Sequence, residues 1–376
     1  MATFPRNDIA SLTAEHPRHD LGESYGPDLR MGDLLTPELA HLELGYGTAP
    51  GDLRLRTAIA DSYLDSSSRP GRHGVRPEQV VVTVGGMHAI FLLAYLLVDR
   101  GGQVVTTQPL FPSTGNAYAS IGADVRVVPL TFDDGYRLTA DAVRAQLTPD
   151  TKLVSLTTPQ NPSGVAIPRQ TLEEIVAAMA EICPDAYLMV DETYRAAAYG
   201  DDPVAATAVD LGPKVVTVAS LSKCHGAAAL RIGWLVSTDA DLVDRVVTAK
   251  FNTVVSASPV TEALAVRVLE REDEILAVRR ASLAEGLAIT EGWVRDNSDV
   301  IEWIRPDAGA LCAVRLKPQV DLGRFRRAAA DLGVRLADGD WFGDEPGVFR
   351  LGFGFPPPVE LKAALDALRQ AVDAAH

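Results

Sequence analysis

Short apolar runs alternate with helical patterns through most of the chain. The apolar runs are rich in Val, Leu and Ile, whereas TLEEIVAAMAEI (171–182) repeats its apolar residues at helical spacing. The strands expected from these runs are residues 80–85, 103–109, 124–130, 152–159, 187–192, 214–221 and 231–237. This alternation is typical of an α/β protein with a mostly parallel sheet that helices cover on both faces.

The residues before and after this alternating region show other patterns. Residues 1–45 are polar, rich in Pro and Gly and without periodicity, which predicts an N-terminal arm with irregular segments. Later residues predict long helices, then short strands near 310–316 and 348–354 and a last helix. We therefore expect a large α/β domain over residues 46–260. A smaller α+β domain is expected from a connecting helix and the C-terminal part, residues 261–376, with part of the arm.

Composition narrows the class of protein. The chain has 35 Lys and Arg against 50 Asp and Glu, a formal net charge of −15, which disfavours nucleic-acid and anionic-membrane partners. No apolar run approaches the roughly 20 residues that span a bilayer, and the first residues lack the pattern of a signal peptide. The three cysteines are widely spaced, and the histidines show no metal-ligand spacing. We therefore expect a cytoplasmic protein that holds no metal.

Polar and aromatic residues collect where the expected strands end. In an open parallel sheet, ligands bind at the carboxyl ends of the strands. The stretch SLSKCHGAAALRIGW (220–234) carries a serine and a lysine at one such end and an arginine eight residues after the lysine. The residues found at or shortly after these ends are Gly85, Gly86, Met87, Phe111, Asn161, Asp191, Tyr194, Ser220 and Lys223, with Arg231 opening the last run.

One group of these residues can hold a phosphate. The two glycines lie at a strand-to-helix turn, where backbone N–H groups and the positive end of a helix attract an anion. Ser220 and Arg231 add a hydroxyl and a guanidinium to the same anion.

A second group suits a flat, charged heterocycle with an aldehyde. Phe111 can stack on the ring, and Asp191 follows an apolar strand, where a carboxylate is costly unless a cation pairs with it. Asn161 and Tyr194 can donate hydrogen bonds to a phenolate-like oxygen, and Lys223 can form an imine. Together with the phosphate group, these features describe a pyridoxal 5′-phosphate (PLP) site.

Three motifs carry a resemblance to a known family. TTPQNPSG, VDETYR and SLSKCHGAAALRIGW occur in this order, and from about residue 21 onward the chain resembles the fold type I PLP enzymes, specifically the class I/II aminotransferases. The resemblance implies a homodimer with shared active sites and a Schiff base between PLP and Lys223. It also implies that Asp191 pairs with the pyridine nitrogen, and that Asn161 and Tyr194 contact the ring hydroxyl. Lys223, Asp191 and Tyr194 are the expected catalytic residues.

The resemblance also assigns the phosphate and the substrate. Arg350, in VFRLGFG, is expected to hold the substrate α-carboxylate, with Asn161 and Gly22 nearby. Glu23 and Tyr25 either face the substrate side chain or lie in a solvated loop. No second arginine is evident that could bind a dicarboxylic substrate, so we expect the substrate side chain to be polar or apolar. Phe111 takes the ring-stacking position, and the phosphate is expected to lie against Gly85, Gly86, Met87, Ser220, Arg231 and, from the neighbouring subunit, Tyr46.

Two enzyme functions stay open, because the cofactor motifs are shared across the fold. The first is an aminotransferase that moves an amino group from an L-amino acid to a keto acid. The alternative is a PLP enzyme of specialised metabolism that performs β/γ-elimination and replacement, cyclisation, decarboxylation or oxidation. A regulatory protein that uses this fold as a sensor is disfavoured, because residues 1–45 show no helix-turn-helix pattern and the net charge is −15.

Overall fold

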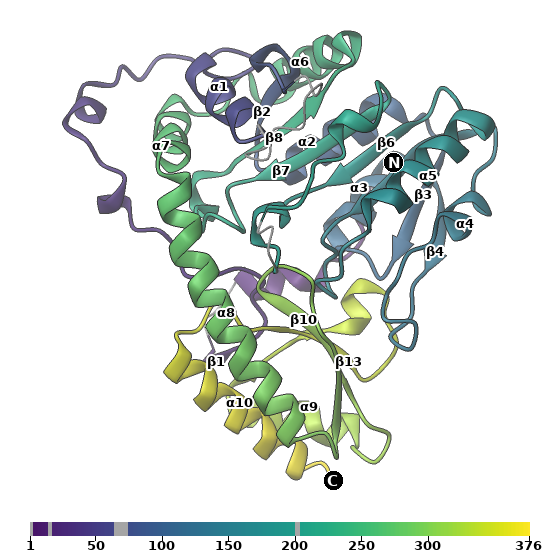
Figure 1. The fold of residues 1–376 in the computed structure, drawn as a ribbon, viewed down its shortest axis with the longest axis vertical. Helices are drawn as coiled ribbons and strands as arrows, with labels where there is room; N and C mark the ends of the chain where they lie inside the picture. The colour runs from purple at the N-terminus through teal and green to yellow at the C-terminus, as the bar shows by residue number, and fades with distance from the viewer. Residues whose placement is uncertain (1–2, 14–16, 64–73, 200–203) are drawn as a thin grey trace.

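The computed structural model describes residues 3–13, 17–63, 74–199 and 204–376. A seven-stranded sheet fills the upper part of the view in Figure 1, and a smaller sheet lies below it. The long helix α8 runs from the upper part down beside the smaller sheet. The expected α/β class is confirmed. Among the described residues, no helix is long and apolar enough to cross a membrane.

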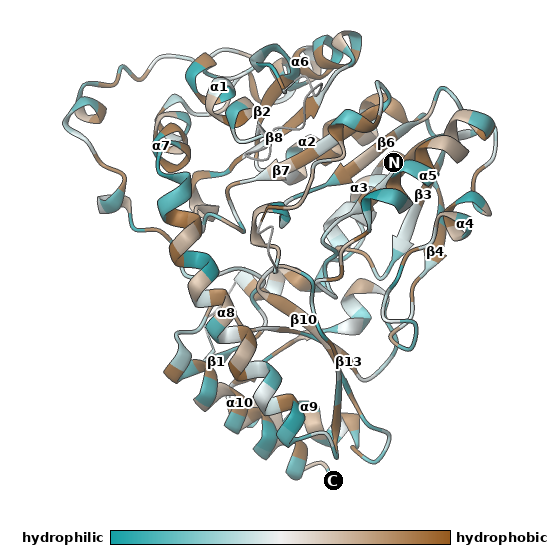
Figure 2. Cartoon of the chain, viewed as in Figure 1, coloured by the Kyte–Doolittle hydropathy of each residue, from teal (hydrophilic) through white to brown (hydrophobic). Residues whose placement is uncertain are grey.

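The large sheet has the order β2-β8-β7-β6-β5-β3-β4. Only β8 runs antiparallel to its neighbours, while the pairs from β7 to β4 are parallel. Except for the edge strand β4, the strands are almost fully buried, as expected for a sheet covered on both faces, and hydrophobic residues are coloured brown in Figure 2. Their bounds are β2 Val80–Val84, β3 Gln103–Gln108, β4 Asp124–Pro129, β5 Thr151–Thr157, β6 Tyr187–Asp191, β7 Val215–Ser220 and β8 Ile232–Ser237.

Helices cover both faces of this sheet. Val80 and Val82 of β2 pack in one apolar cluster with α1 and α7, whereas Val81 packs in another with α2 and α6. Successive side chains of a strand point to opposite faces, so the alternation in β2 places these helix pairs on opposite sides. The helices are α1 Leu53–Asp61, α2 Gly86–Leu97, α3 Pro112–Ile121, α4 Ala140–Arg144, α5 Arg169–Ile182, α6 Ala240–Val254 and α7 Pro259–Glu270.

The smaller sheet is antiparallel, in the order β12-β13-β10-β9. A short parallel pair between β1 and β11 ties the N-terminal segment to this part of the molecule. The amide of Gly352 in β13 then donates to the carbonyl of Leu21 at 2.8 Å, which lays the loop after β1 along β13. The elements are β1 His19–Asp20, α8 Glu272–Asp296, β9 Ile301–Ile304, β10 Leu311–Leu316, α9 Leu322–Asp331, β11 Val334–Arg335, β12 Ala337–Asp338, β13 Val348–Gly352 and α10 Pro358–Asp373.

The segment before α1 is the expected irregular arm. It contains two short 3₁₀ helices, Met31–Asp33 and Pro37–His41. In Figure 1 this dark purple segment extends away from the body of the subunit. Leu44 and Tyr46 at its end are 84% and 91% exposed, so the described part of the chain leaves these two side chains largely uncovered.

Candidate active site

The phosphate side of the site lies where β2, β8 and β7 meet. Gly85 has a φ of +74° between β2 and α2, and a Cβ added there would overlap the guanidinium of Arg231. A Cβ on Gly86 would lie 3.9 Å from that of Ser220, the last residue of β7. The structure therefore brings Gly85, Gly86, Ser220 and Arg231 together, as expected from the sequence.

This cradle suits an anion. Arg231 donates to the carbonyl of Ala228 at 3.0 Å and makes no ion pair among the described residues. The hydroxyl of Ser220 accepts from the amide of Ser222 at 3.3 Å, which leaves its own proton free to donate. Met87 packs its side chain in the apolar layer beside α2, so only its backbone N–H can serve the anion. A helix N-terminus with an unpaired guanidinium is a typical phosphate site.

Asp191 closes β6 in the middle of the site. Its Oδ1 accepts from the amide of Thr193 at 3.0 Å and from the hydroxyl of Thr193 at 2.6 Å. Its Oδ2 makes no hydrogen bond within the described part of the chain. Burial raises the pKa of Asp191, while its bonds to Thr193 and the charge of Lys223 oppose that change. A buried carboxylate with one free oxygen fits a protonated ring nitrogen.

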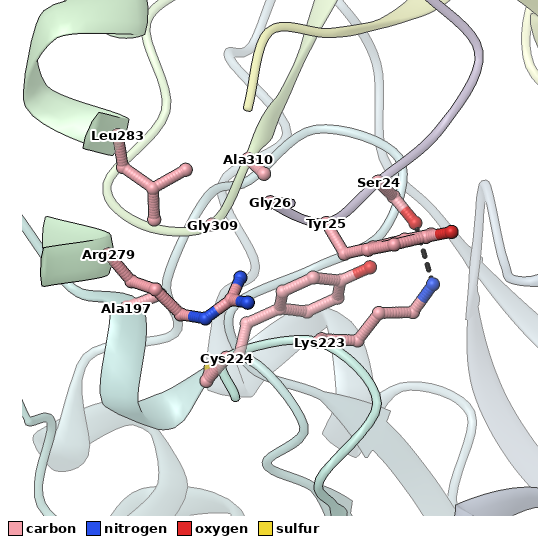
Figure 3. Close-up of a pocket in the computed structure, with 11 residues that line it drawn as sticks. Ser24, Tyr25, Gly26, Ala197, Lys223, Cys224, Arg279, Leu283, Gly309 and Ala310 are labelled. Atoms are coloured by element: carbon pink, nitrogen blue, oxygen red, sulfur yellow. Dashed lines mark hydrogen bonds between the residues drawn. The ribbon is translucent and has the colours of Figure 1, made fainter. Parts of the chain in front are cut away.

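Lys223 lies just after β7 and points into a pocket. Its Nζ donates to the hydroxyl of Ser24 at 3.0 Å, the dashed line in Figure 3, and lies 5.1 Å from the centre of the Tyr25 ring. Burial, followed by the positive charge of Arg350, lowers the pKa of Lys223 to about 8. Because only the neutral amine attacks an aldehyde, this environment favours covalent chemistry at Nζ.

Arg350 provides a positive charge where the substrate α-carboxylate is expected to bind. It lies on β13 and is only 1% exposed. It donates to Asn161 Oδ1 at 3.0 Å and to the carbonyl of Gly22 at 2.5 Å, and its Nε has no partner among the described residues. Burial lowers its pKa. A buried guanidinium without a carboxylate is costly, so the arrangement fits an anionic ligand such as a substrate carboxylate.

The aromatic residues differ in where the structure places them. Tyr194 is buried beside Gly309, and burial raises its pKa, which keeps the phenol protonated and able to donate. Phe111 precedes α3 and packs with Leu12 and Phe342 in an apolar cluster. Tyr46 lies on the exposed arm and is not brought to the site of its own chain.

Two residues of the pocket escaped the sequence analysis. Ser24 contacts the Lys223 amine, and Arg279 enters from α8 on the side opposite Lys223 in Figure 3. Arg279 is buried and donates to the carbonyl of Pro27. The pocket is therefore lined by an arginine other than Arg350, although none was evident from the sequence. No signal in the sequence separates it from other arginines on amphipathic helices, because only the packing of α8 against the N-terminal loop brings it here.

Three local features test the fit of PLP. The cradle at Gly85 leaves room for an anion, Asp191 keeps a free oxygen, and the Nε of Arg350 has no partner. Within the described residues, no group of His, Cys, Asp and Glu could hold a metal. The residues present therefore fit PLP, its phosphate and a substrate carboxylate.

Comparison with known proteins agrees with this geometry. Residues 38–368 match the family described as aminotransferase class I and II. The chain belongs to this family. Members of the class I/II aminotransferases depend on PLP, so this protein is a PLP-dependent transferase.

Individual relatives of this aminotransferase-family protein differ in activity. The arginine–pyruvate transaminase of Pseudomonas aeruginosa is 29% identical over 332 residues, 82% of this chain and 79% of the relative. Capreomycidine synthase of Streptomyces vinaceus is 30% identical over 367 residues, 97% of this chain and 89% of the relative. The crystal structure of a PLP-dependent aminotransferase from Streptococcus suis superposes with a TM-score of 0.88 at 25% identity. It covers 100% of this chain and 99% of that one.

Proposed function

We propose that the protein transfers the amino group of an L-amino acid to a keto acid, with PLP bound covalently to Lys223. One observation carries this proposal. The Lys223 amine, with a pKa of about 8, faces the same site as the buried guanidinium of Arg350, which lacks a carboxylate partner. An amine suited to an aldehyde and a cation suited to a carboxylate are the two groups that an amino-acid substrate on PLP requires.

Bound PLP would supply an electron sink for a carbanion at the substrate Cα. Asp191 would hold the ring nitrogen through its free Oδ2, and the Nδ2 of Asn161 would donate to the ring oxygen. Arg350 would fix the α-carboxylate with two parallel hydrogen bonds and so set the orientation of the Cα–H bond. The Nζ of Lys223 would take the proton from Cα as general base.

The remaining family residues would complete cofactor binding. The backbone N–H groups of Gly86 and Met87, with Ser220 and Arg231, would bind the phosphate. Tyr194 would donate its phenol proton to the ring oxygen. Phe111 would stack on the ring.

We further propose a homodimer in which Tyr46 reaches the phosphate of the partner subunit. The exposed arm and the exposed Leu44 and Tyr46 support this assembly, since apolar side chains of this kind mark protein interfaces. Tyr46→Phe should leave a dimer in sedimentation velocity but weaken PLP binding, whereas Tyr95→Phe on α2 should change neither. A monomer that binds PLP with full affinity would disprove the shared site.

We also propose a cellular location, a metabolic role and a division into domains. Cys183, Cys224 and Cys312 are all free and buried, which supports a reducing, cytoplasmic location. A role in amino-acid biosynthesis is proposed from the reaction class alone. The proposed domains are residues 46–260 and 261–376, the latter joined by part of residues 1–45. Separate apolar clusters around the two sheets support two domains, although α7, at the start of the second range, packs in a cluster with β2 of the large sheet.

An isotope experiment tests the reaction. The PLP-loaded protein is incubated with amino acids carrying a labelled α-nitrogen, starting with L-arginine because of the P. aeruginosa relative, and with pyruvate as acceptor. Transamination predicts labelled alanine and the keto acid of the donor.

Cyclisation or β/γ-replacement is the second candidate, and the similarity to capreomycidine synthase over 97% of this chain favours testing it. In that case a donor that carries a leaving group, such as a hydroxyl, at Cβ or Cγ keeps its labelled nitrogen in the product. No labelled alanine forms, and the leaving group is released, a hydroxyl as water.

A further inference from the structure

The loop after β1 brings three consecutive residues to the substrate side of the site. The carbonyl of Gly22 accepts from Arg350, and the hydroxyl of Ser24 accepts from Lys223. Glu23 lies between them, and its backbone packs so closely on Gly352 of β13 that a Cβ there would overlap it. The position of Glu23 is therefore fixed beside the groups that receive the substrate.

The Glu23 carboxylate lacks a partner. Among the described residues, no hydrogen bond or ion pair reaches it, although the residue is half-buried. Burial raises its pKa, with the opposing positive charges of Lys223 and Arg350 nearby. Asp20 in the same segment is different, because Arg335 pairs with it at 2.5 Å. A half-buried carboxylate left open beside a paired one indicates a ligand rather than a structural ion pair.

The charge of Glu23 acts on the reactive centre. Among negative groups, Glu23 raises the pKa of Lys223 more than Asp191 does, and it also raises that of Arg350. These directions agree with the position of Glu23 in the chain between Gly22 and Ser24, which contact the same two cations. The Tyr25 ring lies at the same place, with the Lys223 amine 5.1 Å from its centre, so it can receive a cation.

Arg279 does not neutralise Glu23. Its guanidinium donates to the carbonyl of Pro27 and enters the pocket on the side opposite Ser24 and Lys223 in Figure 3. No ion pair therefore joins the second arginine to the Glu23 carboxylate within the described part of the chain.

We propose that Glu23, with the ring of Tyr25, binds a cationic side chain of the amino-acid substrate, and that a guanidinium fits best. A guanidinium offers two parallel N–H donors to one carboxylate and stacks on an aromatic ring, which an ammonium does less well. The proposal rests on the proposed function, because it takes Arg350 and Lys223 as the sites of the α-carboxylate and the α-amine.

Unreactive acids test the charge preference without any turnover. Calorimetry on the PLP-loaded protein compares δ-guanidinovalerate, which is arginine without its α-amine, with δ-ureidovalerate, its neutral isostere, and with glutarate. The guanidino acid should bind about tenfold tighter than the ureido acid, as expected for a hydrogen-bonded charge. Equal binding of the two, or tighter binding of glutarate through Arg279, would overturn the proposal.

Variants assign the preference to Glu23. In Glu23→Gln the guanidino acid should lose about tenfold in affinity while the ureido acid stays unchanged. Glu285→Gln, which removes a charge from the exposed side of α8, should keep the wild-type preference. Equal weakening of both acids in Glu23→Gln would contradict the assignment. Binding is measured separately from nitrogen transfer, so a preference for the cation would stand even if the isotope experiment showed cyclisation.

Discussion

The phosphate cradle consists of Gly85, Gly86, Ser220 and Arg231, and the substrate loop consists of residues 22–25 after β1. The two regions differ in which parts of the chain form them. Gly85, Ser220 and Arg231 come from β2, β7 and β8, neighbours in one sheet, and the backbone itself shapes their site. Gly22 and Arg350 are 328 residues apart and meet because the two-residue strand β1 pairs with β11 and because Gly352 of β13 bonds Leu21. The cradle can therefore be kept while the loop changes, which suits a family with one cofactor and many substrates.

Loss of Lys223 should have the largest effect, because this residue serves both regions. Lys223→Ala removes the covalent link to PLP and the general base, so nitrogen transfer should fall by about a thousandfold or more. PLP should still bind through the cradle, without the absorbance of the covalent adduct. Transfer is measured with labelled donor, and adduct formation by visible absorbance.

Lys362→Ala, an exposed change on α10, is the matched control and should behave as wild type. If Lys223→Ala retained the absorbance of a covalent adduct, another amine would hold PLP and the assignment would fail.

Loss of the Arg350 guanidinium should affect the substrate loop and spare the cradle. Arg350→Lys keeps the charge but loses the planar fork of N–H donors that bonds Asn161 and Gly22 and that would hold a carboxylate with two parallel bonds. We expect kcat/KM for the amino acid to fall by about ten- to a hundredfold, mainly through KM, with PLP affinity nearly unchanged. Arg305→Lys, an exposed change, is the control. A matching loss of PLP affinity would show that the two regions are not independent.

The contrast also explains what the sequence could predict. The cradle follows from local patterns, because apolar runs locate the strands and polar residues mark their ends. The environment of Glu23 could not be predicted in this way. Its freedom depends on Arg335 pairing with Asp20 instead, and on the Arg279 guanidinium lying across the pocket. Such facts depend on packing between distant segments, which no local pattern contains.

The cradle itself can be tested through its backbone. Gly85→Ala forces a Cβ onto the guanidinium of Arg231 and should lower PLP affinity by about tenfold, much as Arg231→Gln does. The double variant should lose less than the product of the two, because both act on one guanidinium. PLP affinity is measured by titrating the cofactor-free protein.

Gly101→Ala separates the two causes of this effect. Gly101 also has a positive φ, +81°, but a Cβ there meets nothing within 4 Å, so this variant carries the backbone strain without the overlap. It should leave PLP affinity unchanged. A loss as large as that of Gly85→Ala would mean that strain, rather than displacement of Arg231, is responsible.

The smallest expected effect is a change in the pKa of Lys223. The charges of Glu23 and Arg350 shift this pKa in opposite directions. Its pKa of about 8 predicts that acylation of Nζ in the cofactor-free protein rises with pH to a plateau, with a midpoint near that value. Glu23→Gln removes a negative charge that stabilises the ammonium, so the midpoint should move to lower pH. Arg350→Gln removes a positive charge that opposes the ammonium, so the midpoint should move to higher pH. Mass spectrometry of the labelled peptide gives each midpoint, and shifts in the same direction in both variants would contradict the placement of these two charges around Lys223.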